Sequence, residues 1–150
     1  FGFRRKIDSV KQAIVSLGIK SIRDWFVIIA LTSIDDKPKE LIIITLVRAR
    51  MMQILAEKKK LSPDPCFTTG LFSSIDAIMD QPMHDVMKEL PLSSDISNAL
   101  IKREGEIGML LALVLNYERG NWPEVTDCGI SADDLSSAYL ESMAWATELM

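Results

Sequence analysis

Few side chains in this sequence have the types and spacing that catalysis requires. One histidine, His84, is followed by Asp85, and the only thiols are Cys66 and Cys128. A catalytic divalent ion needs about three protein ligands, such as imidazole, carboxylate or thiolate groups, and one position open to water. Since a chain with a single imidazole cannot build a site from two histidines, we expect no catalytic residue, no metal site and no cofactor.

Two arrangements could suggest catalysis, His84-Asp85 and Cys66 with His84, and both have structural explanations. His84 and Asp85 follow a Gln-Pro dipeptide in the predicted first turn of a short helix, where a carboxylate interacts favourably with the helix N-terminus. A lone histidine without converging partners is usually structural or exposed. A pairing of Cys66 with His84, as nucleophile and base, cannot be judged from their separation in sequence. Because a proline and a phenylalanine flank Cys66, it is better explained as a small apolar side chain in the core.

The charge and the apolar runs limit the classes of partner. The net charge of -4, from 17 Lys and Arg against 21 Asp and Glu, has the wrong sign for a protein that holds a phosphate backbone. The longest apolar runs, residues 25–31 and 107–115, are much shorter than the ~20 residues that span a bilayer. The two cysteines form no CxxC pair, which favours reduced thiols. We therefore expect a cytoplasmic domain that binds neither nucleic acid nor a membrane.

Helix signals run along the whole chain. Apolar residues recur at a spacing of three to four between helix start and stop residues, and 48% of the residues are hydrophobic, enough for a core. The segments near residues 38–60 and 109–117 are apolar nearly all round and should be central. We predict one all-α domain over residues 1–150, a compact orthogonal bundle of about eight helices. The helices are expected near residues 9–18, 21–34, 38–60, 67–79, 83–89, 95–103, 109–117 and 131–150.

Short stretches along the chain are similar, in order and spacing, to those of a known family. They include Ile7-Asp8-Ser9-Val10, Lys37-Pro38-Lys39-Glu40-Leu41, Leu46-Val47-Arg48-Ala49-Arg50, Gly70-Leu71-Phe72-Ser73-Ser74-Ile75-Asp76, Leu90-Pro91-Leu92 and Tyr117-Glu118-Arg119-Gly120-Asn121-Trp122. Together they cover essentially the whole chain. The chain in this respect resembles the HDOD domain, a modified HD or HD-related output domain found at the C-terminal end of bacterial proteins with an upstream EAL domain.

This resemblance implies descent from the HD superfamily of metal-dependent phosphohydrolases. The metal site of those helical enzymes uses a first His, a later His-Asp pair and a further Asp. The pair lies in a context similar to Gly-Leu-Leu-His-Asp-Ile-Gly, and this chain has Ser73 and Ser74 in its place, with Asp76 two residues later. Hydroxyls are poor replacements for an imidazole and a carboxylate. Ser73, Ser74 and Asp76 are therefore the predicted vestigial HD site, whose pocket could still take a small ligand.

The resemblance also implies a function. We expect a non-catalytic regulatory domain of a bacterial signal transduction protein, present here as a C-terminal fragment. The expected partner is the upstream EAL domain, of the kind that binds or hydrolyses cyclic di-GMP, and the basic residues Arg4, Arg5 and Lys6 are the candidate contact to it. Other signalling proteins are further possible partners, and the domain could form an oligomer. Two alternative functions are a residual metal-dependent phosphohydrolase and a purely structural dimerisation domain.

Overall fold

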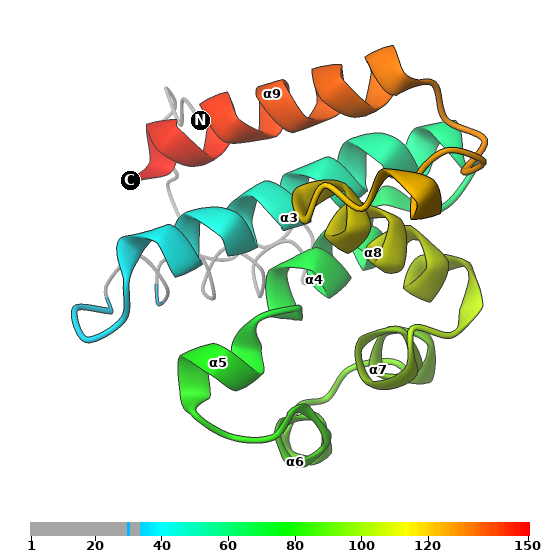
Figure 1. Ribbon diagram of the computed structural model, residues 1–150. Helices are drawn as coiled ribbons and strands as arrows, with labels where there is room; N and C mark the ends of the chain where they lie inside the picture. Colours follow the sequence, from blue (N-terminus) through cyan, green and yellow to red (C-terminus); the bar gives the residue numbers. More distant parts are fainter. Residues whose placement is uncertain (1–29, 31–33) are drawn as a thin grey trace, which may run out of the picture. The chain divides into compact units, whose positions relative to one another are not determined.

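The regular elements that the structure describes are all helical. The computed structural model describes residue 30 and residues 34–150, and within it Asp35–Met150 form one compact unit (Figure 1). The all-α prediction is confirmed for this part of the chain, and the two helices expected between residues 9 and 34 fall almost entirely outside it. In chain order the elements are α3 (Lys39–Lys58), α4 (Pro63–Phe72), α5 (Ile75–Met79), α6 (Met83–Glu89), α7 (Ser94–Lys102), α8 (Gly105–Glu118), the 3-10 helix η1 (Trp122–Glu124) and α9 (Ala132–Leu149).

Helix α3 is the central element of the unit Asp35–Met150. It packs against α4 and α9 along much of its length and against α8 over a shorter stretch. In Figure 1, α9 runs alongside α3, whereas α6 and α7 are seen end-on. Nine of the 20 residues of α3 are buried. The prediction of a central helix is confirmed, although Ile44 in its apolar half remains 42% exposed.

Helices α3 and α4 approach each other most closely at Gly70. A Cβ atom at this position would lie 2.6 Å from the Cα of Ala49 and 2.8 Å from the carbonyl carbon of Arg48. These distances are well below van der Waals contact, and backbone atoms cannot rotate away, so only glycine fits. The close approach places Arg48 opposite the C-terminal end of α4, where Ser73 follows.

The predicted helix over residues 67–79 is wrong in one respect, because the structure has two helices there. Helix α4 begins earlier, with Pro63 in its first turn, and ends at Phe72, and α5 begins at Ile75. The Ser73 hydroxyl donates to the carbonyl oxygen of Gly70 over 2.6 Å, and the Ser73 N–H donates to the same oxygen over 3.2 Å. Such serine-to-backbone bonds compete with helix continuation. Ser73 and Ser74 therefore lie at a turn.

Serine side chains begin two of the other helices. Ser93 Oγ accepts the backbone N–H of Ile96 at α7, and Ser131 Oγ accepts that of Asp134 over 3.1 Å at α9. The second bond confirms the predicted start of the last helix near residue 131. None of the helices that the structure describes combines the length and the apolar character needed to cross a bilayer.

Candidate functional site

The two serines of the predicted vestigial site bind an arginine. Arg48, on α3, directs Nη1 toward the turn between α4 and α5, where it donates to Ser74 Oγ over 2.7 Å and to Ser73 Oγ over 3.2 Å. Its Nε lies 2.9 Å from each carboxylate oxygen of Glu118, at the C-terminal end of α8. We call these four residues the Arg48 cluster. It joins three segments that are distant in sequence.

The charged side chains of the Arg48 cluster are largely removed from water. The side chains of Arg48 and Glu118 are only 16% and 15% exposed, and both serines are buried. Burial raises the pKa of the Glu118 carboxyl, while the charge and the hydrogen bonds of Arg48, together with the charge of Arg119, act in the opposite direction. An ion pair out of water is favourable only when hydrogen bonds also satisfy its remaining groups. The two serine hydroxyls provide those bonds.

Arg103 and Asp76 lie at the edge of the Arg48 cluster. The pKa of Arg103 is lowered, first by burial and then by the positive charges of Arg48 and Arg119, while Asp76 raises it. The guanidinium of Arg103 donates to the carbonyl oxygens of Ala99 and Leu100 at the end of α7. Asp76 accepts the backbone N–H of Ala77 over 2.9 Å in the first turn of α5. The predicted trio is thus brought together only in part, since Ser73 and Ser74 share Arg48 and Asp76 does not bind it.

A comparison with models of known protein families identifies the family of this chain. The family model of the HDOD domain matches residues 1–99. This chain belongs to the HDOD domain family. Its predicted membership is confirmed, and the Arg48 cluster lies at the place where the HD-superfamily resemblance puts the enzymes' His-Asp pair.

Two curated relatives match nearly the whole chain. The HDOD chain is 30% identical over 153 residues to the uncharacterized protein YuxH of Bacillus subtilis, an alignment that covers 97% of this chain and 37% of YuxH. It is 33% identical over 151 residues to the cyclic di-GMP phosphodiesterase CdgJ of Vibrio cholerae, with 95% of this chain and 35% of CdgJ covered. The chain therefore spans little more than a third of the length of these relatives. No solved structure matches it.

The side chains at the predicted vestigial site do not fit a divalent ion. The position holds two hydroxyls, both facing the guanidinium of Arg48. A second cation at this point would be repelled by Arg48 and would have to take Glu118 from it. In the part of the chain that the structure describes, no three His, Cys, Asp or Glu side chains are grouped as metal ligands would be.

The remaining sequence candidates lie apart from the Arg48 cluster. His84 is exposed in the first turn of α6, as predicted, and Asp85 pairs with Lys88 over 3.1 Å. Cys66 is fully buried, and this burial raises the pKa of its thiol to about 11. Its predicted role as a core side chain is confirmed, since a protonated, inaccessible thiol is no nucleophile at neutral pH.

Sequence reasoning missed the two charged members of the cluster. Arg48 and Glu118 both lie in stretches that carry the family resemblance, yet nothing in the sequence pairs residues 70 positions apart. The signal that could have found them is the pair of serines where the resemblance puts a metal-binding pair, since hydroxyls there leave room for a cationic side chain. The predicted contact residues Arg4, Arg5 and Lys6 lie outside the described residues.

Proposed function

We propose that this HDOD chain is a non-catalytic regulatory domain of a cyclic di-GMP signalling protein and acts on an EAL domain that precedes it. The relative CdgJ is named a cyclic di-GMP phosphodiesterase, and most of CdgJ lies outside the region that matches this chain. An activity carried by another part of the full-length protein would leave this domain free to regulate it.

The Arg48 cluster is the observation that carries the proposal. Hydrolysis of a phosphodiester at an HD site depends on a metal-bound hydroxide, which needs neutral or anionic ligands and an open position. Arg48 instead places a permanent positive charge beside Ser73 and Ser74, and both carboxylate oxygens of Glu118 already accept its Nε–H. The hydroxyls of Ser73 and Ser74 and the carboxylate of Glu118 are thus all bonded to Arg48.

The same contacts suit a domain that transmits a signal through contact with a partner. Arg48 on α3 bonds to the turn before α5 and to the end of α8, so one side chain connects three segments. Breaking a buried ion pair costs folding stability, so the pair between Arg48 and Glu118 should hold. The three segments that Arg48 connects should then keep their relative positions when another domain contacts the surface. A domain held in this way can transmit a contact without turning over a substrate.

The test compares the full-length protein with a variant that lacks residues 1–150. Binding and hydrolysis of cyclic di-GMP are measured for both, and the deletion is expected to change Kd or kcat/KM about fivefold or more, the usual size of coupling between sites. Addition of the separate 150-residue chain to the truncated protein is the control, and it should restore part of the change. Identical binding and hydrolysis with and without the domain would refute the proposal.

A second measurement addresses the non-catalytic part of the proposal. The 150-residue chain is incubated with Mn²⁺ and bis-p-nitrophenyl phosphate, and we expect no turnover above that of buffer with Mn²⁺. Turnover that an Asp76→Ala or His84→Ala change abolishes would instead support the residual phosphohydrolase.

A further inference from the structure

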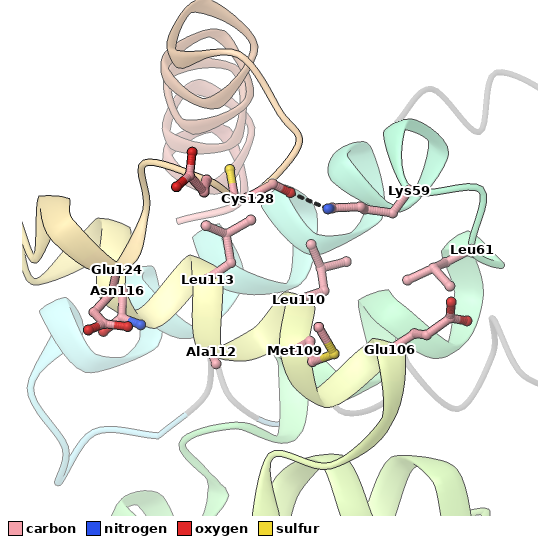
Figure 2. Close-up of a pocket in the computed structure, with 11 residues that line it drawn as sticks. Lys59, Leu61, Glu106, Met109, Leu110, Ala112, Leu113, Asn116, Glu124 and Cys128 are labelled. Carbon is pink, nitrogen blue, oxygen red and sulfur yellow. Dashed lines mark hydrogen bonds between the residues drawn. The ribbon is translucent and has the colours of Figure 1, made fainter.

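A groove runs along one face of α8, away from the Arg48 cluster. Its first hollow has a volume of about 410 Å³ and is lined by Glu106, Met109, Leu113 and Asn116, whose spacing of three, four and three residues places them on one side of the helix. Figure 2 shows Leu110 and Leu113 in the middle of this hollow, Glu106 toward one end and Glu124 toward the other. The hollow is therefore apolar in its centre and acidic at its ends.

A second hollow extends the first one along the start of α8. It also measures about 410 Å³, shares Leu61 and Glu106 with the first, and reaches Asp95 and Glu104. We call the two hollows together the α8 groove. Their succession along one helix makes the groove long and open, a shape that suits a chain segment better than a compact small molecule.

The α8 groove is strongly acidic. Among the described residues that line it, only Lys59 carries an ammonium group, and its Nζ donates to the carbonyl oxygen of Cys128. The carboxylates are those of Asp95, Glu104, Glu106, Glu124 and Asp127, all of them exposed. A partner of complementary charge must therefore carry several lysine or arginine side chains.

The centre of the groove exposes apolar surface that the described residues leave uncovered. Met109 is 69% exposed, the largest exposed fraction among the large hydrophobic side chains of the described residues. Methionine adapts its shape to different apolar partners, and exposed apolar surface with a polar rim is typical of an interaction site. The floor beside Met109 consists of Leu110 and Leu113, which are already well packed.

We propose that the α8 groove binds a basic amphipathic helix of a partner protein. Apolar side chains of that helix, spaced three to four residues apart, contact Met109 and the floor between Leu110 and Leu113, as in other helix-in-groove complexes. Its lysine and arginine side chains face the carboxylates at both ends of the groove. This inference goes beyond the proposed function, because the binding does not depend on an EAL domain or on cyclic di-GMP.

The test uses the full-length protein and a labelled peptide of leucine and lysine, about 18 residues or five helical turns long, in an amphipathic pattern. Two further peptides have glutamate in place of each lysine or the same composition in an order without an apolar face. Fluorescence anisotropy should show the amphipathic basic peptide binding at least about tenfold more tightly than either of the others. Equal affinity for the three peptides, or no binding of any, would overturn the proposal.

Matched variants locate the binding. Met109→Glu should weaken binding of the basic peptide by about tenfold, because an apolar anchor is replaced by a charge that needs water. Leu140→Glu on α9 is the control, since Leu140 is 66% exposed and lies outside the groove. The combined change Glu106→Lys and Asp127→Lys should weaken binding further, whereas Glu148→Lys should leave it unchanged. Loss of affinity in the control variants, or none in the groove variants, would show that the peptide does not bind here.

Discussion

At the scale of single residues, Glu118 has the most consequential side chain of the Arg48 cluster. A Glu118→Leu change removes the carboxylate 2.9 Å from Arg48 Nε and leaves the guanidinium largely out of water with hydroxyl partners only. The expected loss is about 3 kcal/mol of unfolding free energy, at the lower end for a broken buried pair because both side chains keep some exposure. Urea unfolding of the 150-residue chain measures it.

The matched control is Glu141→Leu, which also removes a carboxylate 2.9 Å from an arginine, Arg50. That carboxylate is 57% exposed, so the change should cost less than about 1 kcal/mol. The double variant Arg48→Leu with Glu118→Leu should regain much of the loss, since no charge is then left unpaired. Equal losses for Glu118→Leu and Glu141→Leu would mean that the cluster does not stabilise the fold.

Cys66 gives the fold a dependence on alkaline pH. Its thiol has a pKa of about 11 in the folded chain against 9.0 as the ordinary value, because burial disfavours the thiolate. Between these values the folded chain holds a proton that the unfolded chain has released, so stability falls as pH rises. The Cys66 contribution is thus intact below pH 9 and lost as the pH approaches 11.

Thermal unfolding between pH 8 and 11 tests this expectation. The midpoint of the wild type should fall more steeply with pH than that of Cys66→Ala, whose lower starting stability reflects the lost sulfur and does not affect the slope. Cys128→Ala is the matched substitution at the partly exposed cysteine. Parallel curves for the wild type and Cys66→Ala would contradict the expectation.

At the scale of elements, the contact between α3 and α4 depends on Gly70. In Gly70→Ala, the new methyl group would lie 2.6 Å from the Cα of Ala49, so the two helices must separate. Overpacking of this kind costs ~1–3 kcal/mol or more, and the better helix propensity of alanine returns at most about 1 kcal/mol. We expect a net loss of unfolding free energy and weaker bonds from Arg48 to Ser73 and Ser74.

Gly120→Ala provides a comparison without a clash. A Cβ at Gly120 would meet only Trp122 ring atoms, at 3.8 and 3.9 Å, although the positive φ of 68° makes alanine unfavourable by about 1 kcal/mol. Denaturant unfolding should show Gly70→Ala as the more damaging change. If Gly70→Ala is as stable as the wild type, the close approach of α3 and α4 is not needed for the fold.

Local chemistry predicted some elements well and others poorly. Proline and capping serine residues act on their immediate neighbours, so α6 at Met83–Glu89 and the start of α9 near residue 131 were predicted correctly. The break between α4 and α5 was not, because an apolar run continues on both sides of it. What ends α4 is a bond from Ser73 to Gly70 and a bond from Arg48 on another helix. Only the bond from Arg48 depends on the tertiary structure. The spacing of apolar residues along the sequence reveals neither bond.

At the scale of the whole molecule, the net charge of -4 predicts a class of partner but not where that partner binds. The fold concentrates five carboxylates along α8 and leaves Met109 exposed among them. The segment 109–117 of α8 is apolar nearly all round and was therefore predicted to be a central helix. A groove forms because the described segments around α8 cover only part of it, and that coverage depends on how the helices pack together.

Metal binding is the whole-molecule property that separates the proposed regulatory domain from the residual phosphohydrolase. A ligand that binds only the folded chain stabilises all of it, by about 2.7 kcal/mol at a hundredfold excess over Kd. For a chain of this size that would raise the melting midpoint by roughly 5–10 °C. Because the Arg48 guanidinium faces Ser73 and Ser74, we expect Mn²⁺, Mg²⁺ or Zn²⁺ at about 1 mM to shift the midpoint of the metal-stripped chain by less than about 1 °C.

The informative variants for that measurement are Asp76→Asn and His84→Gln. Each removes a possible ligand without touching the Arg48 cluster, so neither should change the response to metal if the wild type has none. A shift of several degrees in the wild type that either variant abolishes would place a metal site at that residue. The charge of Arg48 would then not exclude a metal ion, and the phosphohydrolase would become the better account of this domain.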